Sequence, residues 1–141
     1  MLHHVGIEVV PDDLERSIKF WQALGFAQVE PPATLSEFVW LEKDGTQIHL
    51  MPSNDPTVPS RGHVAVIAAD FEHAFATLRE RGFEVERRRE HWGAPRALAI
   101  APGGHRVELM AAPASGLGHS PLTVEDRDHA EVQFPRRGDH S

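Results

Sequence analysis

Apolar residues recur at every second position near the start of the chain, which predicts a strand over residues 2–10. The apolar face of this strand carries Val5, Ile7 and Val9. Adjacent side chains of a strand point to opposite faces, so His4 and Glu8 share the other face. The spacing then becomes helical, with apolar positions at Leu14, Ile18 and Trp21. We expect this helix to end at Gly25.

Three further strands complete the first pattern. A short strand ends at Pro31 and Pro32, and two longer strands follow over residues 36–41 and 46–51. The pair Asp44-Gly45 between the longer strands is typical of a hairpin turn. The first part of the chain therefore predicts a βαβββ unit.

The same pattern returns 59 residues later. HVGIEV, which begins at residue 4, has its echo HVAVIA at residue 63, and GTQIHLM at residue 45 has its echo GHRVELM at residue 104. Residues 95–100 align on residues 36–41 at the same spacing. We expect both helices to have N-terminal caps, from Asp12 paired with Glu15 in the first copy and from Asp70 in the second.

The repeat divides the chain into a first βαβββ module (residues 1–54), a second module (61–113) and a polar tail (114–141). The predicted fold class is α+β, with two tandem modules whose sheets form one cleft. Composition favours a loosely ordered tail. Docking of Val124, or of residues 132–134, onto the body or a partner is the alternative.

Composition excludes several classes of protein. A chain of 141 residues with 40% hydrophobic residues can bury one real core. The net charge of −7 argues against nucleic acid or an anionic membrane as partner, and the absence of cysteine excludes disulfides and thiolate chemistry. There is no signal-peptide pattern and no apolar run near the roughly 20 residues that span a bilayer. We therefore expect a soluble cytoplasmic protein.

Four potential metal ligands occupy equivalent places in the two copies: His4, His49, His63 and Glu108. By alternation they all face away from the helices, toward the predicted cleft. A lone strand histidine is more often a surface or hydrogen-bonded residue, and only this joint placement selects three of the 10 histidines. Three imidazoles and a carboxylate suit one divalent ion such as Zn, Ni, Co, Fe or Mn.

The segments LHHVGIEV, GTQIHLM, GHVAVIAADF and APGGHRVELM resemble the vicinal oxygen chelate superfamily over roughly residues 2–112. This superfamily includes glyoxalase I, methylmalonyl-CoA epimerase, extradiol dioxygenases, fosfomycin-resistance enzymes and bleomycin-binding proteins. The resemblance implies paired βαβββ modules around a metal, with the ligand positions at His4, His49, His63 and Glu108. Two positions depart from the family pattern. His49 stands where Glu or Gln is common, and Ala101 replaces the usual Asp before the last turn.

The resemblance implies a small-molecule substrate that chelates the metal through adjacent oxygens. It favours a lyase or isomerase of glyoxalase type, which stabilises an enediolate on the metal while a base moves a proton. Glu108 is the candidate catalytic base, and Glu8 is the alternative. A dioxygenase is the second possibility, although it needs a 2-His-1-carboxylate triad and three open positions, one of which His49 would occupy. A protein that sequesters an antibiotic is the third.

The candidate substrate pocket consists of Phe38, Trp40 and Glu8, which alternation places on the cleft face. A dimer contact is the alternative role for the two aromatic residues. Arg96 or Arg106 would meet an anionic group, if the substrate carries one. We expect a homodimer, because a second copy would cover apolar surface and free strand edges. Whether the cleft forms within one chain or by exchange between two chains stays open.

Overall fold

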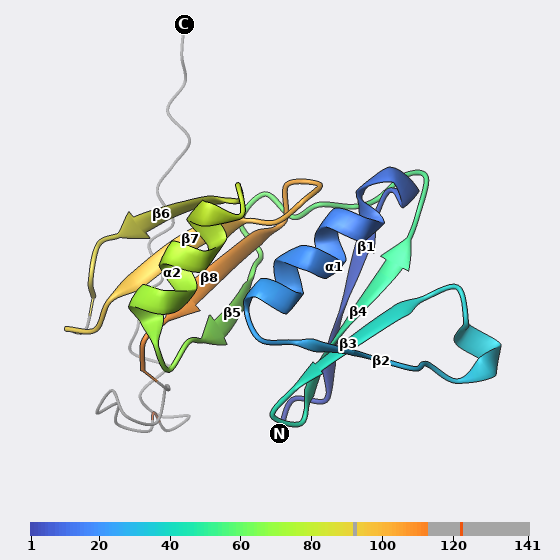
Figure 1. Cartoon of the computed structure of the whole chain (residues 1–141), viewed down its shortest axis with the longest axis horizontal. Helices are drawn as coiled ribbons and strands as arrows, with labels where there is room; N and C mark the ends of the chain where they lie inside the picture. Colours follow the sequence, from blue (N-terminus) through green and yellow to red (C-terminus); the bar gives the residue numbers. More distant parts are fainter. Residues whose placement is uncertain (92, 113–121, 123–141) are drawn as a thin grey trace, which may run out of the picture.

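The computed structural model describes residues 1–91, 93–112 and 122, and it contains two βαβββ modules (Figure 1). The first comprises β1 (His4–Val9), the 3-10 turn η1 (Pro11–Asp13), α1 (Leu14–Ala23), β2 (Ala27–Val29), the 3-10 turn η2 (Ala33–Leu35), β3 (Val39–Lys43) and β4 (Thr46–Pro52). The second comprises β5 (Val64–Ile67), α2 (Phe71–Glu80), β6 (Glu84–Arg88), β7 (Arg96–Ile100) and β8 (Arg106–Met110). The predicted α+β fold with two tandem βαβββ modules is confirmed.

Each module forms its own four-stranded mixed sheet, in the orders β1-β4-β3-β2 and β5-β8-β7-β6. The first and last strands of each module are parallel neighbours in the same register. Gly6 pairs with His49, and Ala65 pairs with Glu108. These pairs are 59 residues apart along the chain, so the structure reproduces the repeat of the sequence.

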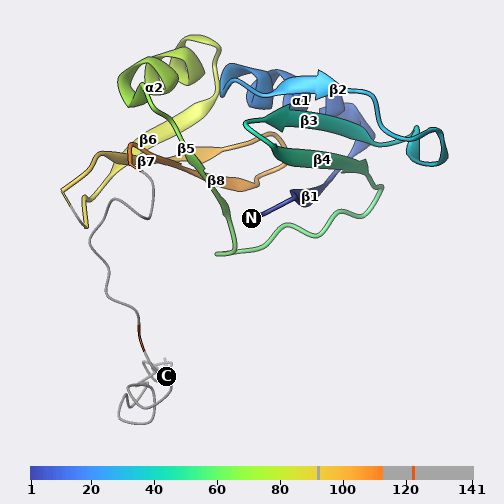
Figure 2. The ribbon, with the colours of Figure 1, turned by 90° about the horizontal axis from the view of Figure 1, so that it is seen from below.

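The hydrophobic core lies between the sheets and the two helices, which occupy the same side of the molecule (Figure 2). Each of the strands β1, β4 and β8 turns alternate apolar residues inward, among them Ile7, Ile48, Leu50, Val107 and Leu109. The modules meet at Phe20 of α1 and Phe83 of the second module, whose rings pack edge to face at 5.3 Å. Arg16 covers Phe83 and donates a 3.0 Å hydrogen bond to the Gly82 carbonyl.

The first predicted helix cap is wrong and the second is confirmed. Pro11 begins a 3-10 turn, so α1 starts only at Leu14 and its N-cap residue Asp13 makes no side-chain capping bond. The Asp12 carboxylate thus lies before the helix and does not cap it. At α2, by contrast, the Asp70 side chain accepts a 3.1 Å hydrogen bond from the backbone N–H of His73.

The long strands also differ in detail from the prediction. β3 begins at Val39, because residues 33–35 form a 3-10 turn, and Phe38 therefore lies outside the strand. The hairpin turn at Asp44-Gly45 is confirmed, with φ of 50° and 80°. The second hairpin has a longer connection, residues 101–105. This shifts β7 by one position, so Leu98 rather than Ala99 occupies the place of Trp40.

The predictions for residues 114–141, including Val124 and residues 132–134, lie outside the described residues apart from Leu122. Within the part of the chain that the structure describes, no helix is long and apolar enough to cross a membrane.

Candidate metal centre in two half-sites

Three aromatic rings form a stack across the first sheet. His49, on the central strand β4, lies between His4 of β1 and Trp40 of β3, with ring centroids 4.0 Å apart in both contacts. The His49 side chain is buried, and its Nε2–H donates a 2.8 Å hydrogen bond to the Gln47 side-chain oxygen. This bond leaves Nδ1 as the nitrogen of His49 that is free to accept. The exposed His3 lies beside His4, with their Nδ1 atoms 2.8 Å apart.

This environment lowers the pKa of His49 below its ordinary value of 6.5. Burial is the largest cause, because a buried imidazolium loses hydration. Repulsion from His4 and then His3 adds to it. The His49 ring therefore stays neutral to lower pH than an exposed histidine, and the neutral imidazole is the form that binds metal ions in general.

The equivalent positions of the second sheet carry His63 and Glu108. His63 Nε2 lies 3.1 Å from one carboxylate oxygen of Glu108, and the side chains are 43% and 13% exposed respectively. Arg96 of β7 holds the other oxygen through its Nε, at 2.7 Å. Arg96 is itself fixed by a 2.8 Å bond to the Arg89 carbonyl. One Glu108 oxygen is thus occupied, and the other faces His63.

The hydrogen bonds of His63 decide what can lie between it and Glu108. Its Nδ1–H donates to the Arg61 carbonyl at 2.9 Å, so the lone pair of a neutral ring is on Nε2 and faces the carboxylate. Two lone pairs at this separation need a cation between them, either a proton or a metal ion. A histidine that donates its other N–H to a backbone carbonyl is the usual arrangement of a metal ligand.

The four predicted ligands therefore form two pairs rather than one cluster. His4 contacts His49 in the first module, and His63 contacts Glu108 in the second. Within one chain, over the described residues, no three His, Asp or Glu side chains come close enough together to hold a metal ion. The donor types suit a divalent ion, but a single chain presents them as two half-sites.

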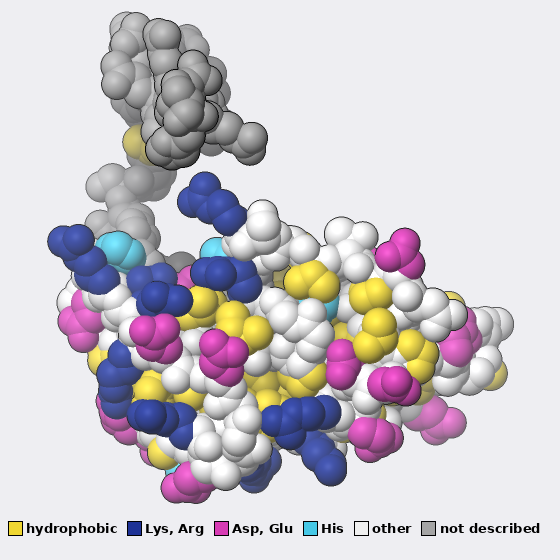
Figure 3. Space-filling model, turned by 90° about the horizontal axis from the view of Figure 1, so that it is seen from above, with side chains coloured by type: hydrophobic (Ala, Val, Ile, Leu, Met, Phe, Trp, Pro, Cys, Tyr) yellow, Lys and Arg dark blue, Asp and Glu magenta, His cyan; other side chains and the backbone are white. Residues whose placement is uncertain are grey.

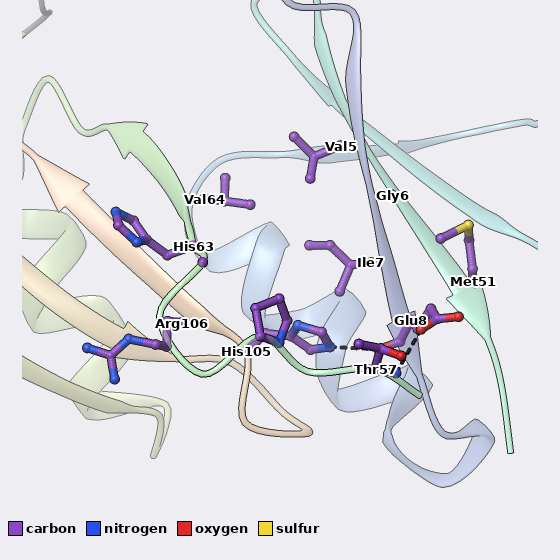
Figure 4. A pocket seen from close by; sticks show the side chains of 12 residues that line it. Val5, Gly6, Ile7, Glu8, Met51, Thr57, His63, Val64, His105 and Arg106 are labelled. Atoms are coloured by element: carbon purple, nitrogen blue, oxygen red, sulfur yellow. Dashed lines mark hydrogen bonds between the residues drawn. The ribbon is translucent and has the colours of Figure 1, made fainter. Parts of the chain in front are cut away.

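The three predicted pocket residues, Phe38, Trp40 and Glu8, do not line one common pocket. A pocket of about 370 Å³ opens between the edge strands β1 and β5, with Glu8 in its lining; Phe38 and Trp40 are not part of that lining (Figure 4). The Glu8 carboxylate accepts a 2.7 Å hydrogen bond from the backbone N–H of Thr57. His63 lines the same pocket, so the alternative base Glu8 and one half-site border a common space.

Sequence reasoning missed His105, which is buried and lines this pocket. Its Nε2–H donates a 2.6 Å hydrogen bond to the Glu8 carbonyl and so ties the second module to the edge of β1. The only available signal was its place directly after the Gly103-Gly104 turn. A turn residue says nothing about which distant strand it will contact.

The sequence matches the family described as Glyoxalase/Bleomycin resistance protein/Dioxygenase superfamily over residues 1–134, and the chain belongs to this family. No curated protein matches it significantly.

Among solved structures, the fold is similar to that of a protein assigned to the glyoxalase family from Bacillus anthracis, with a TM-score of 0.70 and 19% identity over 78% of this chain and 93% of that one. A lactoylglutathione lyase from Agrobacterium tumefaciens gives 0.61 and 16% identity, over 78% and 92% of the two chains. The fosfomycin resistance protein FosX from Mesorhizobium loti gives 0.64 and 17%, over 82% and 94%. At these identities the likeness concerns the fold alone.

Proposed function

We propose that the protein is a divalent-metal-dependent enzyme that moves a proton on a small-molecule substrate, as a lyase or isomerase of glyoxalase type does. The observation that carries this proposal is the His63–Glu108 pair. Two ligands bound to one ion at about 2.1 Å lie about 3.0 to 3.4 Å apart, depending on the angle between them. The pair has a separation of 3.1 Å, and the His63 lone pair faces the carboxylate.

His63 and Glu108 would hold the ion together with His4 and His49, and the ion would supply a Lewis acid that polarises a substrate oxygen. Each residue has a further task that follows from its contacts. The Arg61 carbonyl orients His63, and Arg96 orients Glu108. In this proposal Glu108 would accept the substrate proton through the oxygen on the His63 side, which would first have to leave the ion because Arg96 holds the other oxygen. Glu8 is the alternative base. The apolar pocket beside His63 would hold the rest of the substrate.

The complete site is proposed to form between two chains, so that His4 and His49 of one copy meet His63 and Glu108 of another. Support comes from the separation of the two pairs within one chain. The charges also fit: residues 1–60 contain nine acidic and three basic residues, whereas residues 61–112 contain seven and eight. An acidic first module would therefore attract the second module of a partner. The homodimer and the cytoplasmic location stay predictions.

A dioxygenase is the second candidate, and the surroundings of His49 favour it. Both ring faces of His49 are covered and its Nε2 is occupied by Gln47. In this case His49 would position the residues around it without binding the ion. The remaining ligands would be His4, His63 and Glu108, which is the donor set of the 2-His-1-carboxylate triad.

Metal analysis of the purified protein tests the proposal directly. We expect bound Zn, Ni, Co, Fe or Mn, lost in His63→Ala and Glu108→Gln and retained in the control His73→Ala, which changes an exposed histidine of α2. Hemithioacetal isomerisation and catechol cleavage then separate the two enzymes. If His49→Ala keeps both metal and catechol cleavage, the dioxygenase is correct. If the unaltered protein takes up no metal, a sequestering protein is the remaining candidate.

Mixed dimers test whether two chains share the site. One chain carries His4→Ala with His49→Ala, and the other carries His63→Ala with Glu108→Gln. Each variant alone should bind no metal. A heterodimer purified through two different tags should recover about half of the normal metal content, because one of its two sites is intact. No recovery would place the site within one chain.

A further inference from the structure

A second feature of the same region is a small notch on the open face of the second sheet. It has a volume of about 70 Å³ and is lined by His63, Arg88, Arg96, Leu98, Arg106 and Glu108. Three guanidinium groups and one carboxylate give the notch an excess of positive charge. This contrasts with the net charge of −7 of the whole chain. Figure 3 shows Lys and Arg side chains gathered on the side of the molecule that the second module forms.

The three arginines are not equivalent. Arg96 already uses its Nε–H and one terminal N–H in hydrogen bonds to the Glu108 carboxylate and the Arg89 carbonyl. Arg88 has only a loose ion pair with Glu86, at 3.6 Å between largely exposed side chains. Arg106 is half-buried, and its side chain has no ion pair and no hydrogen bond with any other described residue. Two guanidinium groups with unused N–H donors therefore border the notch, beside the His63–Glu108 pair.

We infer that the notch binds a small oxyanion, such as a carboxylate, phosphate or phosphonate group, and that Arg106 and Arg88 are its ligands. Guanidinium groups bind such oxygens through paired, charge-assisted hydrogen bonds. The volume has room for one group of this size and not for a whole substrate. Glu108 does not repel the anion, because Arg96 already balances its charge at 2.7 Å.

The position of Arg106 extends this inference to the class of substrate. Arg106 and His63 line both the notch and the larger pocket between β1 and β5. In Figure 4 their side chains extend to the same side, away from Ile7 and Met51. Val5, Ile7 and Val64 make the pocket largely apolar. A ligand with its anionic group in the notch would place an apolar portion in the pocket, so the proposed substrate is a small apolar molecule that bears an oxyanion.

The meaning of this site for catalysis rests on the proposed function, but anion binding can be measured without metal. Inorganic phosphate is titrated into protein freed of metal by a chelator at constant ionic strength, and the arginine Nε–Hε resonances are followed by NMR. A saturable shift of Arg106 is expected. Arg106→Gln should weaken binding by about tenfold or more, and Arg88→Gln by a few-fold. Arg81→Gln, which removes the same charge from the end of α2, should leave binding unchanged.

Several outcomes would overturn the inference. The first is that no Arg106 resonance shifts saturably with phosphate, and the second is that Arg106→Gln binds phosphate as tightly as the unaltered protein. The third is that phosphate binds only after metal is added, since the anion would then be a ligand of the metal. Arg106→Lys keeps the test open if the glutamine variant fails to fold, and it should bind with intermediate affinity. Phenylphosphonate should bind more tightly than phosphate. Equal affinities would refute the claim that the pocket between β1 and β5 holds an apolar portion of the ligand. Metal uptake is scored separately, so the two proposals fail independently.

Discussion

At the scale of single residues, the candidate site depends on which atom of each ring carries a proton. The Arg61 carbonyl fixes the proton of His63 on Nδ1, and Gln47 fixes that of His49 on Nε2. The free nitrogen of each ring is therefore set by a neighbour two positions away in the sequence. Such partners matter because changing them typically costs about 10- to 100-fold in metal affinity.

Trp40 should report metal binding, because its ring stacks on His49 at 4.0 Å. Adding Ni²⁺ or Co²⁺ to the metal-free protein should quench tryptophan fluorescence. In a Trp92→Phe background, which removes the tryptophan that lies outside the described residues, Trp40→Phe should lose most of this quenching while its metal content stays the same, since Trp21 is buried in the core. Quenching that persists in the variant lacking both Trp40 and Trp92 would place the ion away from His49.

The lowered pKa of His49 predicts how the stability of the metal-free protein changes with pH. The unfolded chain takes up a proton near pH 6.5, and the folded protein takes it up only at lower pH. The unfolded state therefore binds more protons at this site in this window, so the contribution of His49 lowers the free energy of unfolding as the pH drops below 6.5. Urea unfolding at pH 7.5 and 5.5, with chelator present, should show a smaller loss for His49→Gln than for the unaltered protein. An equal loss in both would contradict the assignment, and His73→Gln serves as the control.

At the scale of elements, the two helices begin differently although they occupy equivalent places in the repeat. Asp70 caps α2 through the N–H of His73, whereas Pro11 starts a 3-10 turn that moves Asp12 out of the capping position. A proline with its fixed φ favours this early turn. The stability of α2 should therefore depend on Asp70 more than the stability of α1 depends on Asp12.

Asp70→Ala should therefore destabilise the protein by about 1 kcal/mol, because a backbone donor of α2 loses its partner. Asp12→Ala is the matched control and should change stability by less than about 0.5 kcal/mol, as other surface substitutions do. Urea unfolding of both variants measures the difference. Equal effects of the two substitutions would mean that the capping bond contributes nothing.

At the scale of the whole molecule, β1 and β5 are each one of the two edge strands of their sheet, and the outer side of each has no strand partner among the described residues. The two half-sites lie beside these edges, since His4 begins β1 and His63 directly precedes β5. A second copy is the simplest partner that could complete the half-sites, because within one chain β1 and β5 border a common pocket without bringing the two pairs together.

Light scattering should accordingly give a mass of about twice 15.7 kDa at micromolar concentration. The dimer should persist in His63→Ala, because its contacts extend beyond the metal ligands. A measured mass of one chain at this concentration would contradict both the predicted dimer and the proposal that two chains share the site.

The sequence by itself determined the repeat, the order of the elements and the faces of the first and last strands of each module. In β7 the alignment was wrong by one position, because the second hairpin connection is longer. Alternation within a strand and the repeat spacing of 59 residues can both be seen in the sequence alone, and they make His4, His49, His63 and Glu108 candidates whose role stays a prediction. The start of β3 and the cap of α1 were wrong by a few residues, because short 3-10 turns compete locally with strand and helix.

Only the tertiary structure decided how these faces are arranged. Alternation places a side chain on one side of its own sheet, but it does not say which other sheet lies opposite. That depends on how the modules pack, here through Phe20 and Phe83, and it leaves the four candidate ligands as two pairs. The Arg96–Glu108 ion pair, and the position of Arg106 beside it without an ion-pair partner among the described residues, arise from the packing of β7 on β8, which no local pattern encodes.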